Sequence, residues 1–487
     1  MTRTQIVETV TADTQADLMR RLADATAGDL VELRVDGVAD LDVAAAVAHA
    51  PRPAIVTCRA SWEGGRWQGD EAGRRRIFAA ACAAGAAFVD IERRAGWMPD
   101  VRGTATRVVV SDHDFGGVPG DLAARLSEMR RQGADVVKVA ARVRTATDLL
   151  HLQAVARQSA GDVPQVVIGM GEAGYLTRLL PARFASAWTY AGSAAIAPGQ
   201  MPARWLRDRF RVADVTDDTR LFGVAGAPIS HSASPAMHNA ALQAAGIDAV
   251  YLPVYAASAA DAHVLARHFG FAGLSVTAPI KRGWLDLPGV ETNDNLVTRL
   301  GAVNTVRIAD GRMQVCNFDV PACLDGLSAA GVSCSGARAL VLGAGGAARA
   351  AALGLAQSGA DVTVSARRDN EATALADHLG VHSTPWPPHG PWDIVVNATS
   401  CGTWPAVDEA PVSLASLQPR VVYDLIYNPE RTALLRDADA RGLVTVGGLD
   451  MLVAQAARQF TWWTGVSPDA AVMRDAARQF VQETREQ

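Results

Sequence analysis

Short apolar runs alternate with longer amphipathic stretches along the first 213 residues. The runs have the length of buried strands, and most are followed by a segment of helical periodicity. Strands are predicted at Ile6–Val10, Leu30–Val35, Ala54–Cys58, Phe88–Ile91, Arg107–Ser111, Val136–Ala140, Gln165–Ile168 and Trp188–Ala191. Helices are predicted at Thr14–Ala27, Asp70–Ala84, Asp121–Gln132, Thr147–Ser159 and Gly174–Pro181. The segment after the fourth strand is short of helix. Eight strands with interleaved helices predict an α/β fold that begins with a (β/α)8 TIM barrel, placed at residues 1–214.

The pattern restarts at Leu221, after the short polar stretch FRVADVTDDTR. A strand at LFGVAG, a serine-containing loop, a helix at Asn239–Ala245, a strand near Val250–Val254 and a strand ended by Pro279 are predicted. We assign residues 218–487 to a second α/β unit. It is divided into 221–320, a nucleotide-binding part at 321–450, and C-terminal helices at 451–487 that return to the first part.

A strand, glycine turn, helix and second strand follow one another at Ala339–Ser365. The turn contains Gly343, Gly345 and Gly346, and this order is typical of the first half of a Rossmann dinucleotide-binding unit. Arg367 and Arg368 stand where NAD-binding folds usually carry Asp or Glu, which favours the 2′-phosphate of NADP. A tight structural turn and two solvated arginines are the alternatives.

Length, charge and cysteine content indicate how many domains, which partners and which compartment to expect. A chain of 487 residues is too long for one core, and a net charge of −5 gives no reason to expect nucleic acid or an anionic membrane as partner. The six cysteines are scattered without metal-ligand spacing or a disulfide framework, and no metal site is expected. The polar N-terminus lacks an apolar core and no long apolar window follows, so a reducing cytoplasm is the simplest compartment. The oligomeric state is left open.

Polar residues lie at the ends of the predicted barrel strands, where barrel enzymes place their chemistry. They are Glu32, Arg34, Arg59, Glu63, His113, Lys138, Arg178 and Gln200. Lys138 lies between two valines, and desolvation is expected to lower its pKa toward neutrality and free the amine to attack a carbonyl. An ion-paired structural lysine is the alternative, as a turn-capping loop residue is for His113.

The second half offers further candidates. Ser232 and Ser234 precede the predicted helix and could hold a carboxylate, or they could simply cap the helix. Lys281, Asn304 and Asp319 each lie close to a strand end. A lysine–aspartate pair can relay a proton beside a carbinol, although such a pair is more often a surface salt bridge.

The motifs of the first half together resemble type I 3-dehydroquinate dehydratase over about 200 residues. They are ELRVD, TCR-x3-E, FVDIE, SxHDF, VVKVA, MG-x2-G-x3-R and APGQ. The resemblance implies that Lys138 forms an imine with the substrate ketone, and that His113, oriented by Glu63, is the general acid and base in the loss of water. It also implies that the substrate carboxylate and hydroxyls are held by Glu32, Arg34, Arg59, Arg178 and Gln200. The usual serine before APGQ is Ile196 here.

The second half resembles shikimate dehydrogenase from Leu221 onward. The motifs are SxSP, VTxPxK, GAVNT, GAGGAAR, NATSxG, D-x2-Y-x-P-x2-T-x2-L and GG-x2-ML-x2-Q. The resemblance implies a catalytic pair, Lys281 and Asp319, and NADP as cofactor. It implies substrate contacts from Ser232, Ser234, Thr277, Asn304, Tyr427 and Gln455. It implies cofactor contacts from Gly343, Gly345, Gly346, Ala347, Ala348, Arg349, Arg367, Arg368, Asn397, Thr399 and Ser400.

The expected function is a bifunctional shikimate-pathway enzyme that converts 3-dehydroquinate to 3-dehydroshikimate and then reduces it to shikimate. Departures from the family pattern at Ser275, Phe318 and Ala366 motivate a second hypothesis. Because Ser275 and Phe318 are expected to line or adjoin the substrate cleft, the dehydrogenase half could prefer quinate or an amino-substituted analogue. A third hypothesis is a catalytically silent, metabolite-sensing regulator.

Overall fold

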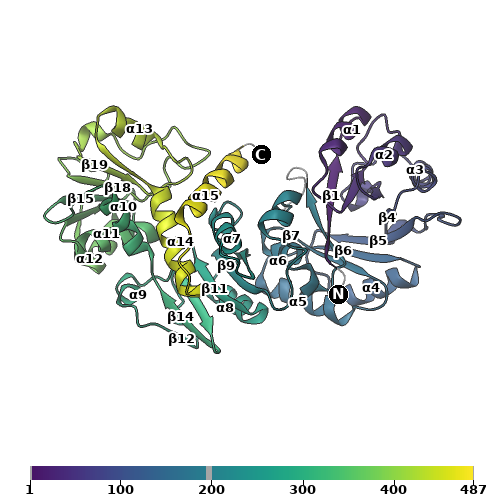
Figure 1. Ribbon diagram of the computed structural model, residues 1–487, viewed down its shortest axis with the longest axis horizontal. Helices are drawn as coiled ribbons and strands as arrows, with labels where there is room; N and C mark the ends of the chain where they lie inside the picture. Colours follow the sequence, from purple (N-terminus) through teal and green to yellow (C-terminus); the bar gives the residue numbers. More distant parts are fainter. Residues whose placement is uncertain (1–2, 193–199, 486–487) are drawn as a thin grey trace.

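The computed structural model describes residues 3–192 and 200–485 and contains three sheets (Figure 1). The first sheet has eight parallel strands in the order β7-β6-β5-β4-β3-β2-β1-β8. They are β1 (Gln5–Thr11), β2 (Leu30–Arg34), β3 (Ala54–Thr57), β4 (Phe88–Glu92), β5 (Arg107–Asp114), β6 (Val136–Arg142), β7 (Gln165–Met170) and β8 (Trp188–Gly192). Gln165 of the edge strand β7 forms a bridge with Ser186, two residues before the other edge strand, β8, so the sheet is a nearly closed barrel. The predicted barrel is confirmed.

Helices cover the outside of this barrel. They are α1 (Gln15–Asp24), α2 (Val43–His49), α3 (Glu71–Ala83), α4 (Leu122–Arg131), α5 (Ala146–Gln158) and α6 (Tyr175–Leu179). After β4 the chain forms only a short 3-10 helix, Arg93–Ala95, in the segment that the sequence shows to be short of helix. Inside the barrel, alternate strand residues form an apolar layer that includes Val7, Phe88 and Trp188. Since side chains alternate along each strand, the next inward-facing residues toward the carboxyl ends form a second layer, which is polar.

The second sheet has the strand order β10-β9-β11-β13-β14-β12. Its strands are β9 (Arg220–Gly226), β10 (Ala249–Tyr255), β11 (Phe271–Val276), β12 (Val290–Glu291), β13 (Thr305–Ala309) and β14 (Arg312–Cys316). Helices α7 (Ser234–Ala244), α8 (Ala259–Phe269) and α9 (Asn295–Leu300) accompany them. Two predicted boundaries are wrong. Helix α7 begins five residues earlier than expected because Pro235 fits the first helical turn, and β11 ends at Val276, before Pro279.

The third sheet is entirely parallel, with the order β17-β16-β15-β18-β19-β20. Its strands are β15 (Arg338–Leu342), β16 (Asp361–Ser365), β17 (His382–Ser383), β18 (Ile394–Asn397), β19 (Val421–Asp424) and β20 (Val444–Gly447). Helices α10 (Asp319–Ala329), α11 (Gly346–Gln357), α12 (Asp369–Leu379) and α13 (Ala433–Ala440) accompany it. The strand order reverses between β15 and β18, which is where doubly wound sheets bind ligands.

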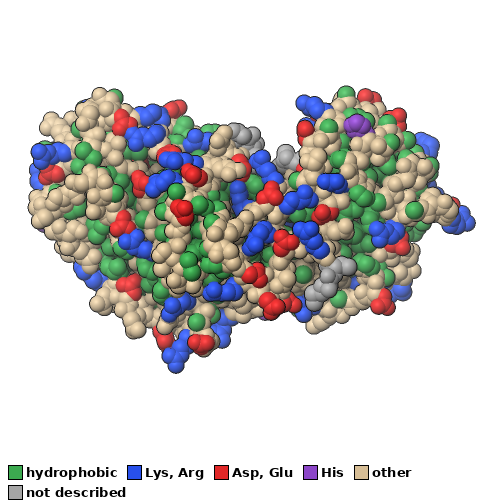
Figure 2. All heavy atoms as spheres, in the orientation of Figure 1, with side chains coloured by type: hydrophobic (Ala, Val, Ile, Leu, Met, Phe, Trp, Pro, Cys, Tyr) green, Lys and Arg blue, Asp and Glu red, His purple; other side chains and the backbone are tan. Residues whose placement is uncertain are grey.

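The last two helices, α14 (Gly448–Thr464) and α15 (Ala470–Arg485), return to the second sheet, where the Trp463 indole donates to the Val306 carbonyl. One apolar core also joins the barrel to the second sheet: Phe184 of the barrel stacks on Phe269 of α8 with ring centroids 6.0 Å apart. On the face shown in Figure 2, basic and acidic side chains are interspersed over both halves.

Candidate active sites

Lys138 lies in the polar layer of the barrel, on β6, and only 5% of it is exposed. Its Nζ donates to Asp90 Oδ2 at 3.0 Å and to Glu32 Oε1 at 3.3 Å. The same nitrogen lies 4.0 Å from the centre of the Tyr190 ring. Glu32 in turn accepts hydrogen bonds from the hydroxyls of Thr9 and Thr57. The arrangement places one amine among carboxylates in the middle of the barrel.

The sequence predicts a lowered pKa for Lys138, and this direction is wrong. Burial alone lowers the pKa of an ammonium group, but the carboxylates of Asp90 and Glu32 outweigh it, and the pKa of Lys138 is raised above its ordinary value. In the structure described, the amine is therefore protonated and ion-paired. The sequence shows the buried lysine, but not its neighbours, because they come from strands far away in the chain.

Asp90 is the residue of this layer that the sequence prediction missed. It is fully buried on β4 and accepts hydrogen bonds from Arg59 at 2.8 Å and from the Ser111 hydroxyl at 2.6 Å, besides the bond from Lys138. Burial opposes ionisation, but Arg59 and Lys138 keep the pKa of Asp90 well below its usual range. The alternation in FVDIE, with Phe88, Asp90 and Glu92 on one face, is the signal that could have found it.

His113 and Glu63 are in contact, as the resemblance implies. His113 Nδ1 lies 2.9 Å from Glu63 Oε1, and the same oxygen accepts the His113 backbone N–H at 3.0 Å. Burial raises the pKa of Glu63 to about 7. Burial, together with the charges of Arg59 and Lys138, lowers the pKa of His113 well below its ordinary value. At neutral pH the imidazole is uncharged, and its Nε2 is the ring nitrogen that can exchange a proton with a substrate.

The predicted arginines of the barrel differ in their surroundings. Arg59 is paired with Asp90 and Glu92, and Arg34 donates two hydrogen bonds to Asp36. Arg178 is buried on α6, where Nη1 donates to the Gly169 carbonyl and Nε has no partner among the described residues. Burial lowers the pKa of Arg178 to about 10. Gln200 is half-buried at the start of the second described range, and Ile196 lies outside the described residues.

Lys281 and Asp319 are brought together between the second and third sheets. Lys281 Nζ donates to Asp319 Oδ2 at 2.5 Å, and Asn304 Nδ2 donates to Asp319 Oδ1 at 2.8 Å. Asp319 is the first residue of α10, and its backbone N–H is accepted by the Asn317 side chain at 2.9 Å. Both carboxylate oxygens therefore have a donor, and the aspartate is fixed in orientation. The lysine remains partly exposed.

The other predicted substrate residues come from four segments of the dehydrogenase half. Ser234 is buried as the first residue of α7, and its backbone N–H donates to Ser232 Oγ at 3.3 Å. The Tyr427 hydroxyl donates to the His231 carbonyl of the same loop at 3.4 Å. Thr277 lines a cavity with Lys281. Gln455 is half-buried on α14, where it donates to the Leu452 carbonyl.

Ser275 and Phe318, where the chain departs from the family pattern, make contacts within the protein. The buried Ser275 hydroxyl accepts from Tyr251 at 2.6 Å and donates to Gln459 Oε1 at 2.7 Å. The Phe318 ring packs edge-on against Trp462, with centroids 6.0 Å apart. Gln459 also donates to Thr305 Oγ1, next to Asn304. Sequence reasoning missed Gln459, four residues after the predicted Gln455 on the same helix.

The glycine turn between β15 and α11 has the geometry of an anion site. Gly343 has φ +109°, which favours glycine, and a Cβ there would lie 3.0 Å from the Ala398 carbonyl oxygen. Helix α11 begins at Gly346 without a side-chain cap from any described residue, so its first N–H groups, including those of Ala347 and Ala348, remain available to a phosphate. Arg349 follows in the same turn and lines the cavity that Thr277 and Lys281 share.

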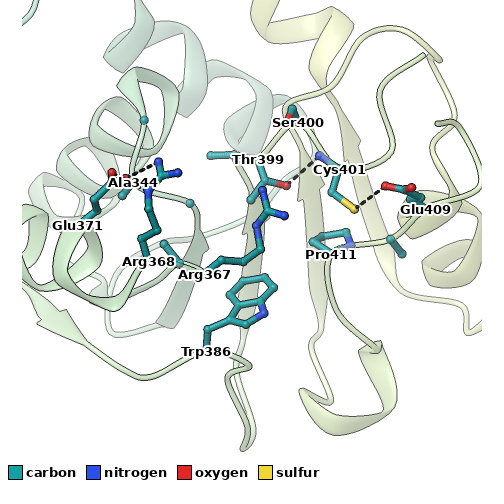
Figure 3. Close-up of a pocket in the computed structure, with 15 residues that line it drawn as sticks. Ala344, Arg367, Arg368, Glu371, Trp386, Thr399, Ser400, Cys401, Glu409 and Pro411 are labelled. Carbon is teal, nitrogen blue, oxygen red and sulfur yellow. Dashed lines mark hydrogen bonds and ion pairs between the residues drawn. The ribbon is translucent and has the colours of Figure 1, made fainter. Parts of the chain in front are cut away.

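A cavity of about 550 Å³ opens beside this turn (Figure 3). Arg367 extends into it between Trp386 and Thr399, and Arg368 donates two hydrogen bonds to Glu371, of 2.6 and 2.7 Å. Among the described residues none forms an ion pair with Arg367. Thr399 and Ser400 line the opposite wall, and the buried Asn397 holds Thr399 by accepting its hydroxyl at 2.7 Å. Glycine turn, uncapped helix and unpaired guanidinium together fit a dinucleotide with a 2′-phosphate.

Within residues 3–192 and 200–485, no group of three His, Cys, Asp or Glu side chains is placed to hold a metal ion. Over the same ranges, every helix is too short or too polar to cross a membrane.

Comparison with known proteins matches both halves of the chain. The type I 3-dehydroquinase family matches residues 6–217, the shikimate dehydrogenase substrate binding domain matches 224–306, and the shikimate 5′-dehydrogenase C-terminal domain matches 448–478. The bifunctional 3-dehydroquinate dehydratase/shikimate dehydrogenase of Arabidopsis thaliana, a chloroplastic protein, is 33% identical over 477 residues, which cover 90% of this chain and 78% of that protein.

Two further comparisons concern the second half. The NADP(+) shikimate dehydrogenase of Methanosarcina mazei is 38% identical over 278 residues, 54% of this chain and 99% of that protein. A crystal structure of a shikimate dehydrogenase in complex with NADP+ superposes with a TM-score of 0.51 at 32% identity, and covers 55% of this chain and 97% of that one. The chain therefore belongs to the family of bifunctional 3-dehydroquinate dehydratase/shikimate dehydrogenases, in which a type I dehydroquinase, a lyase, is joined to an NADP-dependent oxidoreductase.

Proposed function

We propose that residues 1–214 convert 3-dehydroquinate to 3-dehydroshikimate through an imine at Lys138, and that residues 218–487 reduce this product to shikimate with NADPH. The observation that carries the first step is a lysine amine inside the barrel, among carboxylates and near the His113–Glu63 pair. The second step is supported by the fixed Lys281–Asp319 pair beside the glycine turn. The product of the first reaction is the substrate of the second.

In the dehydratase, the amine of Lys138 adds to the substrate ketone and water leaves, which gives a protonated imine. Because only the neutral amine attacks, the ammonium first loses its proton to a neighbouring base. The iminium nitrogen then accepts the electrons released when His113 removes the α-proton. His113 returns this proton to the departing β-hydroxyl, which leaves as water. Hydrolysis of the imine releases dehydroshikimate and restores Lys138.

In this mechanism Glu63 and Asp90 act on the catalytic groups. Glu63 holds His113 at Nδ1, so Nε2 is the nitrogen that removes the α-proton and returns it to the hydroxyl. Asp90 and Glu32 stabilise positive charge at the Lys138 nitrogen, both before attack and in the iminium. Arg178, whose buried Nε lacks a partner among the described residues, is the guanidinium best placed to gain one from the substrate carboxylate.

In the dehydrogenase, Ser232 and Ser234 bind the substrate carboxylate, while Thr277, Asn304, Tyr427 and Gln455 contact the ring hydroxyls. Lys281 delivers a proton to the carbonyl oxygen as it becomes a hydroxyl, and Asp319 holds the ammonium in place at 2.5 Å. The glycine turn would hold the pyrophosphate of NADPH, Arg367 and Arg368 its 2′-phosphate, and Asn397, Thr399 and Ser400 would lie toward the nicotinamide. NADPH supplies the hydride when it is bound.

Arg367 is expected to decide between NADPH and NADH. Its guanidinium extends into the cavity, whereas Arg368 is already paired with Glu371. Replacing Arg367 with alanine should raise the KM for NADPH by about tenfold or more and change the KM for NADH by less than about twofold. Steady-state kinetics with both cofactors measure this, and Arg368→Ala is the matched control with a smaller expected effect. Equal changes for the two cofactors would contradict the assignment.

The proposed function predicts a coupled reaction in one protein. Dehydroquinate plus NADPH should consume NADPH without any added enzyme, and the loss of absorbance follows it. In the reverse direction, NADP+ should be reduced faster with shikimate than with quinate. A preference for quinate would support the reading based on Ser275 and Phe318. No consumption of NADPH with either dehydroquinate or dehydroshikimate would favour the silent regulator.

We further propose that the enzyme works in a reducing compartment such as the cytoplasm. All six cysteines, Cys58, Cys82, Cys316, Cys323, Cys334 and Cys401, are present as free thiols. Its partners would be the small-molecule acids of these two reactions.

A further inference from the structure

The loop that carries Ser232 lies against the barrel. This loop joins β9 to α7, and Glu172 of the barrel, just after β7, accepts two of its backbone N–H groups: Ile229 N–H at Oε2 and Ser230 N–H at Oε1, both at 3.3 Å. Tyr175, also from the barrel, interacts through its hydroxyl with the Ser230 side chain. Figure 1 shows β7 and α6 of the barrel next to α7 and β9. A carboxylate from one half therefore fixes the backbone of a substrate loop in the other.

The segment that presents Glu172 forms a tight turn. A Cβ on Gly174 would lie 2.2 Å from the Gly169 carbonyl oxygen, so the chain turns back on itself too closely for any other residue. The Thr177 hydroxyl accepts the Gly169 N–H at 2.9 Å and donates to the Gly174 carbonyl at 2.7 Å, which closes the turn. The close backbone approach and these hydrogen bonds therefore fix the turn that carries Glu172.

The serine loop has two other kinds of support, and both come from the dehydrogenase half. Ala227 N–H donates to the Ala278 carbonyl at 3.3 Å, and the Tyr427 hydroxyl donates to the His231 carbonyl at 3.4 Å. Glu172 adds both oxygens of a carboxyl group, one to each backbone N–H. The two contacted residues, Ile229 and Ser230, precede Ser232 by three and two positions. The contacts therefore fix the backbone that leads into the serines.

We propose that Glu172 of the barrel is a positioning residue of the dehydrogenase, which acts by holding the Ile229–Ser230 backbone so that Ser232 and Ser234 meet the substrate carboxylate. The inference rests on the proposed role of these serines. It makes the dehydratase domain a structural part of the second active site, because the same short segment after β7 carries both Glu172 and the dehydratase residue Arg178.

A positioning role for Glu172 should affect the KM for shikimate rather than kcat. The serines contact a carboxylate that does not react, so their displacement weakens the binding of substrate and of transition state equally. Glu172→Ala should therefore raise the KM for shikimate about tenfold and change kcat less than about twofold, with the KM for NADP+ unchanged. Glu172→Gln, whose single amide oxygen can still accept one N–H, should give an intermediate KM.

The decisive experiment is a double-mutant cycle in the full-length protein with Glu172→Ala, Ser232→Ala and the combined variant. If Glu172 acts through the serine loop, the combined variant should show a KM for shikimate close to that of the weaker-binding single variant. Gln243→Ala is the matched control, because it also removes a side-chain hydrogen bond between the halves, to the Asp208 carbonyl at 3.1 Å, away from the serine loop. Dehydratase activity and thermal unfolding report on folding of each variant.

The outcomes separate the two proposals. An unchanged KM in Ser232→Ala would refute the role of the serines in substrate binding. A raised KM in Ser232→Ala together with an unchanged KM in Glu172→Ala would overturn only the inference about Glu172. A combined variant whose KM is the product of the two single effects, or a Gln243→Ala variant as impaired as Glu172→Ala, would overturn it as well. If Glu172→Ala does not fold, Glu172→Gln carries the same comparison.

Discussion

Replacing Lys138 with alanine should lower dehydration of 3-dehydroquinate by at least about 1,000-fold and leave reduction of dehydroshikimate nearly unchanged. The amine is the nucleophile of the proposed imine, and no other lysine is on the barrel, since the remaining lysine of the chain, Lys281, is in the dehydrogenase half. Two assays on one preparation measure the effect: formation of dehydroshikimate, and oxidation of NADPH when dehydroshikimate is supplied directly.

The control for this variant follows from its ion pairs. Removal of Lys138 leaves the carboxylates of Asp90 and Glu32 buried without their cation, which costs about 3–5 kcal/mol of stability for a buried pair. Lys138→Arg keeps the positive charge but cannot form an imine, so it should be equally inactive and more stable. Borohydride with dehydroquinate should trap an adduct on the wild type at Lys138 and not on either variant. Substantial dehydratase activity in Lys138→Arg would refute imine catalysis.

Replacing Lys281 with alanine should have the opposite effect, with kcat for shikimate oxidation lowered about 10²- to 10⁴-fold and dehydration unaffected. Lys281 is the group that moves the hydroxyl proton in the proposed mechanism, and its Nζ already donates to Asp319. The measurement is the rate of NADP+ reduction at saturating shikimate, compared with dehydratase activity in the same sample.

Asp319→Asn is the second variant for this site. Asparagine keeps the shape of the side chain and can still accept the hydrogen bond from Asn304, so the fold of the α10 terminus should be retained. Its kcat should fall as well, since the lysine then lacks a fixed counter-ion. If either substitution at this pair stopped both reactions in folded protein, two independent active sites would be the wrong description.

Most of the fold could be predicted from the hydrophobic pattern. The eight barrel strands match the apolar runs because each is buried on both faces, and the glycine turn lies between the predicted strand and helix. The errors lie at boundaries. Serine and proline at positions 234 and 235 are typical of both a loop and a first helical turn, and only packing of α7 against its neighbours decides between them.

The sites were predicted less completely. Residue types at strand ends indicate which side chains could react, and Lys281–Asp319 and His113–Glu63 are brought together as expected. The charge of Lys138 could not be predicted, because its sign of pKa shift depends on Asp90 and Glu32, which lie 48 and 106 residues away in sequence. Contacts between the halves, such as that of Glu172, could not be predicted, because the motifs of each half do not indicate which residues meet the other half.

The apolar core that joins the barrel to the second sheet has a consequence for any attempt to divide the protein. The short polar connection at 214–218 is a natural place to cut the gene, but Phe184 and Phe269 stack across the junction and belong to one core. Each fragment would carry half of that stack into water, which favours insolubility over independent folding. The link between the two halves is therefore more than a tether, because they share part of one apolar core.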